Sequence, residues 1–402
     1  MTVDWSDLTP DLVCTIALKL ETFEDFINFS TVCRSWNHAS SLIKHEWRAT
    51  PVAPWLLLVE NPNENSKCER MIFNLENNKC YKFNLPEMIG ARCWGSAYGW
   101  IAMVDRDLNA QLFNPITKAR ICFPSVRPLS PDADDDCFTD YEDYINWFLH
   151  GFLIRLIVLK ITGDEFVIMI LYNNYNLQAY ARPGDLSWTE LCSSNVTNYR
   201  MVDVATLDDN VFGLYDNGAI VYWNVKQFRG CGLVKPVNYC PSSQPEIFEE
   251  LKQGFHKIYL VRSSSQLFMV LRFKDDVAAI NADNEFDYDY DFVYRTIGFE
   301  VYSLNHKDRK WEKIEDFGDV ALIVGNNSSM CVSVASSKNT LPNCIYFTDD
   351  EADMWSLTKD NSGHDMGVCD IKRQKITKFY ECGNMGALRY PPTFFIPQFQ
   401  NK

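Results

Sequence analysis

The stretch Gly99-Trp100-Ile101-Ala102-Met103-Val104, followed after a polar turn by Ala110-Gln111-Leu112-Phe113-Asn114-Pro115, decides the fold class. Two short apolar runs flank the turn, and the second run ends at Asn-Pro. Asn can bond its own backbone and Pro cannot continue a strand, so both residues favour a further turn. This pattern predicts two short strands joined by a hairpin.

The same pattern of paired apolar runs recurs from Trp55 to the C-terminus, and many of the runs contain aromatic residues. Examples are Phe166–Tyr172 with Leu177–Tyr180, Val211–Tyr215 with Ala219–Trp223, Leu267–Phe273 with Gly298–Leu304, and Asn343–Phe347 with Gly367–Ile371. About six units of roughly fifty residues fit this region, the period of propeller blades. We therefore predict a mostly β protein with a β-propeller-like domain of about six blades. A large β-sandwich or two stacked β-domains remain open.

Residues 8–47 show helical periodicity instead. Thr9 can cap a first helix that has Pro10 at its first position. Thr22 begins a near capping box ahead of a second helix, and the range 31–43 predicts a third. So small a bundle rarely forms a sufficient core alone, so we expect some of its apolar side chains to enter a partner's groove.

The string Leu8-Thr9-Pro10-Asp11-Leu12, with Ile16, Leu20, Phe26 and Val32-Cys33-Arg34-Ser35-Trp36, resembles the F-box, although the family usually has Pro at the position of Thr9. The resemblance implies a three-helix bundle that docks onto a Skp-type adaptor within an SCF (Skp–cullin–F-box) ubiquitin ligase. By matching position, the adaptor-binding residues would be Leu8, Pro10, Leu12, Ile16, Leu20, Val32, Cys33 and Trp36. The alternative is an unrelated helical hairpin whose apolar residues form an ordinary core.

A second resemblance covers the chain from about Trp55 onward. Residues 95–100, 112–117, 298–302, 343–348 and 395–397 are similar to the KIB-type domain, a kelch-like or propeller-like domain that follows the F-box in many plant proteins. We therefore expect an F-box over residues 1–50 and a substrate-recognition domain over residues 51–402. Gly95 and Gly99 are expected to supply unusual backbone angles.

Composition excludes several classes of partner and compartment. The net charge is −15 with no Lys/Arg run, which disfavours nucleic acid. The 14 cysteines form no C-x-x-C pair and have no zinc-ligand spacing, so we expect reduced thiols in the nucleus and/or cytoplasm. Acids near Met1 argue against a signal peptide. The apolar segment 145–171 is interrupted by Arg155, Lys160, Asp164 and Glu165, which predicts two buried strands and no membrane association.

No phosphate-binding, metalloprotease or serine-hydrolase motif occurs, and the six histidines are scattered. We therefore expect no catalytic residue, no cofactor and no metal. Two acidic clusters, Asp132–Asp143 and Asp283–Asp291, are interpreted as solvated loops or as surfaces that steer a basic partner. The second cluster fails as a calcium loop, because Tyr288 replaces the required Gly and Tyr294 the required Glu.

The leading hypothesis is a non-catalytic substrate receptor of an SCF-type ligase. It would bind a Skp-type adaptor, and through it a cullin and a RING protein, and would present an unknown protein substrate. One alternative is a binding protein that occludes or sequesters its partner without ubiquitination. Another is a propeller that binds a glycan or small ligand in an aromatic-lined central pocket.

Overall fold

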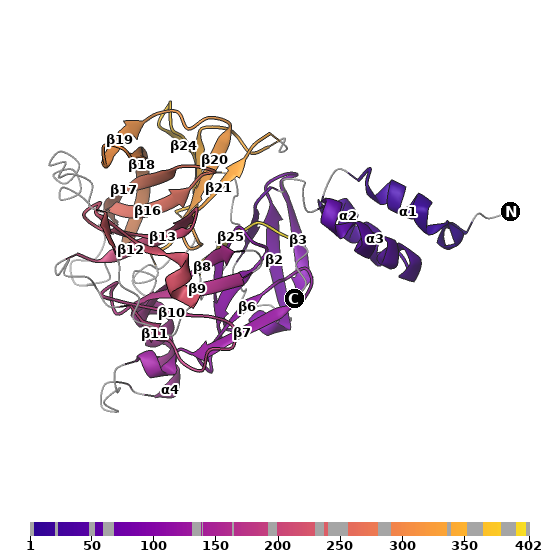
Figure 1. The fold of residues 1–402 in the computed structure, drawn as a ribbon, viewed down its shortest axis with the longest axis horizontal. Helices are drawn as coiled ribbons and strands as arrows, with labels where there is room; N and C mark the ends of the chain where they lie inside the picture. Colours follow the sequence, from indigo (N-terminus) through magenta and orange to yellow (C-terminus); the bar gives the residue numbers. More distant parts are fainter. Residues whose placement is uncertain are drawn as a thin grey trace.

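The computed structural model describes residues 4–20, 23–47, 53–58, 68–130, 138, 140–162, 165–191, 199–229, 237–239, 256–279, 291–335, 339–351, 365–378 and 391–398. The N-terminal part is a helical bundle that lies beside the β2–β3 side of a large β-domain (Figure 1). No helix in the described ranges is long and apolar enough to cross a membrane.

The bundle consists of a 3₁₀ turn at Trp5–Asp7 and helices α1 Pro10–Ala17, α2 Phe23–Thr31 and α3 Arg34–Trp47. Thr9 occupies the N-cap position ahead of Pro10, as predicted, but its side chain makes no capping hydrogen bond. Thr22 lies outside the described residues. The third helix begins at Arg34 and not at residue 31, because α2 continues to Thr31 and the next two residues form the corner between the helices.

The bundle has a compact apolar core. Val13, Ala17, Phe26, Phe29 and Ala39 are each no more than 5% exposed. Val13 and Ala17 are four residues apart in α1, and Phe26 and Phe29 are three apart in α2, so each of these two helices turns one apolar stripe inward, toward Ala39 of α3. The half-buried Trp36 packs against this core, with its ring centroid 4.5 Å from that of Phe29. The three helices therefore hold one another without using every large apolar side chain of the module.

The remaining described residues form six sheets, which we name blades I to VI in chain order. Blade I contains β25 Thr393–Phe395, β1 Trp55–Leu57, β2 Glu69–Asn74 and β3 Lys79–Asn84; blade II contains β4 Arg92–Gly95, β5 Ile101–Val104, β6 Asn109–Phe113 and β7 Arg120–Ser125; blade III contains β8 Leu153–Thr162, β9 Glu165–Tyr172, β10 Leu177–Ala181 and β11 Thr189–Glu190. Blade IV contains β12 Met201–Leu207, β13 Asn210–Tyr215, β14 Ile220–Asn224 and β15 Val237–Tyr239; blade V contains β16 His256–Arg262, β17 Leu267–Ala279, β18 Asp291–Asn305 and β19 Lys310–Ile314; blade VI contains β20 Val320–Val324, β21 Met330–Ser333, β22 Cys344–Phe347, β23 Gly367–Asp370 and β24 Lys375–Thr377.

Six apolar clusters lie between successive blades, the last of them between blades VI and I, and the cluster between blades I and II also includes the core residues of the bundle. Trp100 belongs to the cluster between blades II and III, Trp223 to the next, and Trp311 to the cluster between blades IV and V. Such a ring of face-to-face sheets is a six-bladed β-propeller. The predicted fold class is therefore confirmed, and the sandwich and stacked-domain alternatives are wrong.

The ring is closed by its two chain ends. β25 pairs antiparallel with β1, with Trp55 opposite Phe395 and Leu57 opposite Thr393. Gly95 of blade II lies against this strand, where an added Cβ would stand 1.9 Å from the Phe394 carbonyl oxygen. Gly99 adopts a φ of 76°, as expected, but the expectation for Gly95 is wrong, because Gly95 serves close backbone approach and not a left-handed turn.

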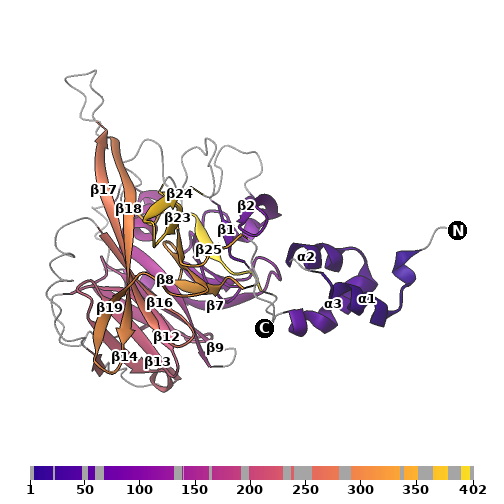
Figure 2. The ribbon, with the colours of Figure 1, turned by 90° about the horizontal axis from the view of Figure 1, so that it is seen from above.

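Two segments differ from the sequence prediction. The first part of the range 145–171 is helical, with α4 at Tyr141–Trp147 and a π-helix at Phe148–Phe152, because Asp140 caps α4 by accepting a hydrogen bond from the Asp143 amide at 2.8 Å. Strands β17 and β18 are longer than predicted and rise together out of the propeller (Figure 2).

Candidate functional site

The bundle leaves several large apolar side chains in solvent. Leu12 is 54% exposed and Val32 is 58% exposed, and Pro10 is also exposed. Four of the other predicted adaptor-binding residues are half-buried and pack against the core, namely Leu8, Ile16, Leu20 and Trp36, while Cys33 is half-buried at the corner between α2 and α3. Of the eight predicted adaptor-binding residues, three are therefore exposed on the bundle and five are half-buried beneath or beside them.

The 3₁₀ turn is fastened to the start of α3. The Trp36 indole Nε1 donates to the Trp5 carbonyl oxygen at 3.1 Å, and the Ser35 hydroxyl donates to the Ser6 carbonyl oxygen at 3.3 Å. These bonds bring Cys33 and Trp36 next to the segment that leads to Leu8. The sequence prediction missed Trp5, Leu18 and Leu42, which are 62%, 47% and 59% exposed. Leu18 and Leu42 fall outside the core stripes of their helices, a signal that the sequence already contained.

A second candidate region lies on the propeller axis, where the segment Gly325–Ser329 between β20 and β21 contacts other blades; we call it the hub. Asn326 Nδ2 donates to the Cys93 carbonyl oxygen of blade II at 3.0 Å, and the Asn326 carbonyl oxygen accepts from Thr393 of blade I. The Ser328 amide donates to the Gly95 carbonyl oxygen at 2.9 Å. The hub therefore joins blade VI to blade I, which contains the closing pair of strands, and to blade II.

The hub also holds the opposite side of the ring. The Val158 amide of blade III donates to Ser328 Oγ at 3.0 Å, and Arg155 Nη2 donates to the Asn327 carbonyl oxygen at 2.6 Å. Ser329 Oγ lies 2.6 Å from Asp203 Oδ2 of blade IV, to which it donates. Blades I to IV thus all meet one segment of blade VI, and the centre of the ring is filled with polar groups that form bonds between the blades.

Asp203 extends this arrangement to blade V. Its Oδ2 atom accepts from the Leu260 amide at 2.8 Å and lies 3.5 Å from Arg155 Nη2. Its side chain is fully buried, and burial raises the pKa of Asp203, although Arg155 and the Ser329 hydroxyl act in the opposite direction. A carboxylate so placed is retained only where several donors surround it.

Above the hub lies a small depression, which we call the axial mouth. Its polar lining comes from four blades and includes Arg92, Arg155, Tyr175, Lys257, Asn326 and Asp350. The imidazole of His150 also faces it, and burial, together with the charge of Arg92, lowers the pKa of His150 to about 3. The lining is thus charged, and the aromatic-lined pocket expected for a glycan-binding propeller is not what the described residues form here.

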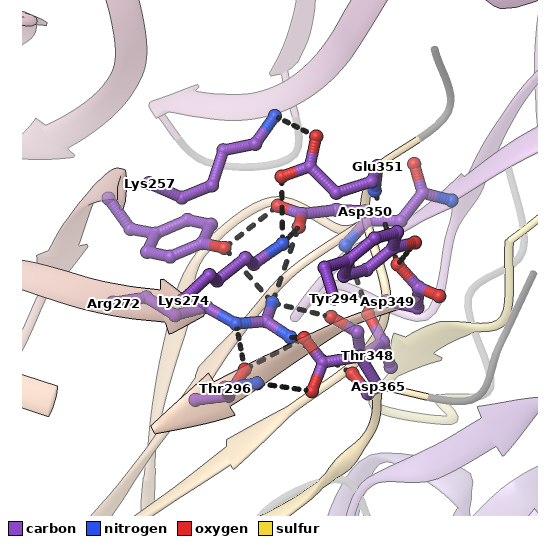
Figure 3. Close-up of polar contacts among 12 residues, drawn as sticks. Lys257, Arg272, Lys274, Tyr294, Thr296, Thr348, Asp349, Asp350, Glu351 and Asp365 are labelled. Carbon is purple, nitrogen blue, oxygen red and sulfur yellow. Dashed lines mark hydrogen bonds and ion pairs between the residues drawn. The ribbon is translucent and has the colours of Figure 1, made fainter. Parts of the chain in front are cut away.

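Beside the axial mouth, ion pairs cross from blade V to the segment after β22 (Figure 3). We call Lys257, Arg272, Lys274, Asp350, Glu351 and Asp365 the charged network. Lys274 Nζ lies 2.8 Å from Glu351 Oε1, and Lys257 Nζ lies 3.2 Å from Glu351 Oε2. Arg272 Nη2 lies 2.9 Å from Asp365 Oδ2. Burial would raise the pKa of Asp350, but Lys274, Lys257 and Arg272 outweigh it and hold that pKa well below the usual range.

The charged network fastens the base of the β17–β18 hairpin. Thr296 of β18 donates through its hydroxyl to Asp365 Oδ2 at 2.8 Å, and the Tyr294 hydroxyl donates to Asp349 Oδ1 at 2.7 Å. On the opposite side of the same strand, Arg295 and Ile297 are exposed. The hairpin therefore has one face bound to the propeller and one face open to solvent, next to the axial mouth.

Sequence reasoning missed the axial residues. In the sequence Arg155 is only a charge that interrupts an apolar segment, and no motif of the sequence analysis includes Asn326 or Asn327. In the structure all three are buried at the axis. A charge inside a strongly apolar strand was the available signal. Of the acidic clusters, the ranges 131–137 and 280–290 lie outside the described residues, and Asp140–Asp143 form the start of α4 and not a loop.

Among the described residues, no group of three or more His, Cys, Asp or Glu side chains is placed to hold a metal ion. The two regions differ in chemistry: the bundle offers an apolar surface, and the propeller face offers charge. Both are suited to binding.

Comparisons with known proteins agree with this division. Residues 5–46 match the F-box domain, and residues 72–370 match the KIB1-4 beta-propeller. The chain is 23% identical to F-box protein At2g17036 of Arabidopsis thaliana, covering 98% of this chain and 95% of the relative. It is 23% identical to the Arabidopsis F-box protein SKIP23, covering 98% and 96%, and 24% identical to the Arabidopsis F-box/kelch-repeat protein KIB1, covering 86% and 78%.

Among solved structures, YCF48 from Cyanidioschyzon merolae aligns at 9% identity and a TM-score of 0.32, covering 61% of this chain and 66% of that one, too low to support any argument. The family match is different in kind, because it spans residues 72–370, which is most of the propeller. The chain belongs to the KIB1-4 beta-propeller family and carries an F-box domain ahead of its propeller.

Proposed function

We propose that this chain is the substrate-recognition subunit of an SCF-type ubiquitin ligase. An F-box implies binding of a Skp-type adaptor. The observation that carries the proposal is that the bundle forms its own core yet leaves Leu12 and Val32 more than half exposed. Exposed apolar side chains of this size, rimmed by polar residues, are typical of a protein–protein interface.

The adaptor face that we propose contains Leu8, Pro10, Leu12, Ile16, Leu20, Val32, Cys33 and Trp36. Within it, Leu12 and Val32 would enter the adaptor directly, since they are the most exposed of the eight for which exposure is given. The half-buried members would support them from below, because they pack against the bundle core. The adaptor would bring a cullin and a RING protein, and the chain itself would catalyse no reaction.

The propeller would hold the protein target near the ubiquitin-charged enzyme, which raises the local concentration of the acceptor lysine. The face with the axial mouth and the β17–β18 hairpin supports this role best, because it combines charged groups with a projecting, firmly based arm. We place the protein in the nucleus or cytoplasm, where SCF ligases would operate and where single cysteines stay reduced.

Co-purification tests the proposal. The full chain should recover the Skp adaptor, cullin and RING protein together, and the double variant Leu12→Asp with Val32→Asp should recover none of them. These positions are preferable to Ile16, because both are exposed and the fold should tolerate the new charge. The matched control is His38→Asp with Ser41→Asp, two exposed positions of α3 outside the proposed face. Equal recovery by both double variants would reject the adaptor face.

Target turnover separates the remaining alternatives. A substrate receptor lowers the abundance of its bound target, and this decrease requires the adaptor face. A protein that only occludes its partner leaves the abundance unchanged while it still binds. The assay therefore compares target abundance in cells that express the wild type or the Leu12→Asp, Val32→Asp variant.

A further inference from the structure

The axial mouth contains more positive than negative groups in its lining, although the chain as a whole carries a net charge of −15. Arg92, Arg155 and Lys257 face it, against the single carboxylate of Asp350. The local charge of the mouth is thus opposite in sign to the net charge of the chain. A concave site lined by such charges focuses their electrostatic field and attracts ions of the opposite sign.

The carboxylates nearest to these cations are also engaged by other donors. Glu351, 3.2 Å from Lys257 Nζ, lies 2.8 Å from Lys274 Nζ, and Asp203, 3.5 Å from Arg155 Nη2, accepts from the Leu260 amide. Asp350 accepts from the Tyr259 hydroxyl at 2.8 Å and lies 3.3 Å from Arg272 Nη1 and 3.4 Å from Lys274 Nζ. Two further cations, which also pair with Asp365 and Glu351, thus lie against the one carboxylate of the mouth. Little of its negative charge remains to oppose an anion entering from solvent.

Arg155 is held at the floor of the mouth by one side of its guanidinium. The bonds of its Nη2 atom go to the hub and toward Asp203, whereas its buried Nε has no hydrogen-bond partner among the described residues. The residue is only 7% exposed. A buried guanidinium donor without a partner is unfavourable for structure alone, and Arg presents five such donors.

The wall residues Lys257 and Tyr175 are positioned to meet an incoming group. The Lys257 side chain is 22% exposed. Lys257 lies near the start of β16, where it pairs with Arg272 of β17, the first strand of the hairpin. Tyr175 follows Asn173 and Asn174 in a turn where all three adopt left-handed φ angles of 52°, 52° and 64°. Tyr rarely adopts this conformation, and such strain is retained where it fixes a functional side chain.

We propose that the axial mouth is an anion-binding subsite that takes the carboxylate or phosphate of an acidic or phosphorylated side chain in the protein target. This inference rests on the proposed receptor function and names the chemistry of its target. Lys257 and Arg155 would bind the oxygens, and the Tyr175 hydroxyl would donate a further hydrogen bond. The mouth is small, so it would hold one acidic group while flanking residues of the target contact the β17–β18 hairpin.

Inorganic phosphate is the first probe, used with the full chain bound to its Skp adaptor. Phosphate should raise the melting temperature more than chloride at equal ionic strength. Lys257→Gln should weaken phosphate binding about tenfold, because one charge-assisted hydrogen bond is lost. Lys226→Gln, which removes an exposed charge after β14, should bind like the wild type. Lys257→Arg keeps the positive charge and should bind phosphate like the wild type. This result would show that Lys257→Gln loses binding through its charge and not through misfolding.

Peptides identify the source of the anion. The array contains random extended peptides with a central Glu, phosphoserine or Gln. Peptides with Glu or phosphoserine should displace phosphate from the chain, and the matching peptides with Gln should not. Equal effects of phosphate and chloride, or full phosphate binding by folded Lys257→Gln, would overturn the site. Phosphate binding without displacement by any acidic peptide would overturn the assignment to the target in favour of a free anion.

The same samples distinguish failure of this inference from failure of the receptor function. Lys257 lies in blade V, far in sequence from the bundle, so Lys257→Gln should recover the adaptor as well as the wild type does. Loss of adaptor binding by the wild-type chain would reject the receptor function whatever the result with phosphate.

Discussion

The bundle and the propeller place their side chains in opposite ways. The bundle keeps Leu12 and Val32 in solvent, while the propeller buries Asp203 and Arg272 at 0% exposure. Burial of charge is unfavourable unless donors and acceptors are matched, and exposure of large apolar groups is unfavourable unless a partner covers them. In the propeller the buried charges pair with one another, whereas we propose that another molecule covers the exposed apolar side chains of the bundle.

This difference also separates structural from binding roles. In the propeller, the charges of Arg155 and Asp203 join blades through the hub, so their removal should unfold the domain. In the bundle, the exposed side chains join nothing within the chain, so their removal should leave the fold intact and abolish an interaction. The comparison can be tested by measuring stability and binding on the same variants.

The largest expected loss of stability comes from Asp203→Ala. The change removes the acceptor of the Leu260 amide and of Ser329, and it leaves Arg155 buried beside no carboxylate. Breaking a buried pair from one side costs about 3–5 kcal/mol in the free energy of unfolding. Urea denaturation measures it, with Asp107→Ala at an exposed position as the control. A loss below about 1 kcal/mol would mean that the hub does not hold the blades together.

A smaller loss is expected from Gly95→Ala. The new Cβ would meet the Phe394 carbonyl oxygen, so β25 must shift at the closing junction. Such overpacking costs about 1–3 kcal/mol. In the control Gly151→Ala, the nearest neighbouring atom is 3.6 Å from the new Cβ, and stability should change by less than about 0.5 kcal/mol. Similar urea midpoints for the two variants would argue against tight closure of the ring.

The pH dependence of stability tests the axial mouth. The pKa of His150 is lowered from 6.5 to about 3 in the folded chain, so the unfolded chain binds the proton more tightly. This contribution is therefore fully present above pH 6.5 and is lost as the pH falls toward 3, with a slope of up to about 1.4 kcal/mol per pH unit. His150→Gln should flatten that slope between pH 6.5 and 5, and His306→Gln should not. An unchanged slope in His150→Gln would place this imidazole in solvent.

The smallest change in stability is expected from Leu12→Asp with Val32→Asp. Both side chains are more than half exposed, so the free energy of unfolding should change by about 0.5 kcal/mol or less. The melting temperature of the bundle, followed by far-UV circular dichroism, measures this change. Marked unfolding would show that these side chains belong to the core, and the contrast with Asp203 would disappear.

Local patterns made the bundle and the blades predictable from the sequence. The apolar positions of α1 recur at helical spacing, and paired apolar runs mark hairpins such as β9–β10 and β13–β14. Turn chemistry was also readable: Asn114 Oδ1 accepts from the Ile116 and Thr117 amides, as Asn-Pro suggested. Each of these features depends on residues that are near one another in the chain.

The hub and the axial mouth were not predictable, because their bonds join distant residues. Ser328 and Val158 are separated by 170 positions, and Asn326 and Cys93 by 233. No periodicity marks such pairs. The helical start of the range 145–171 was missed for a different reason: its apolar residues fit a buried strand equally well, and only the cap at Asp140 distinguishes the two.

Amide hydrogen exchange of the full chain, measured with and without the Skp adaptor, tests whether the adaptor covers the exposed side of the bundle. We expect slower exchange in α1 and at the corner around Val32 when the adaptor is present, and unchanged exchange in the six blades. Unchanged exchange in the bundle, or protection confined to the propeller, would contradict this expectation.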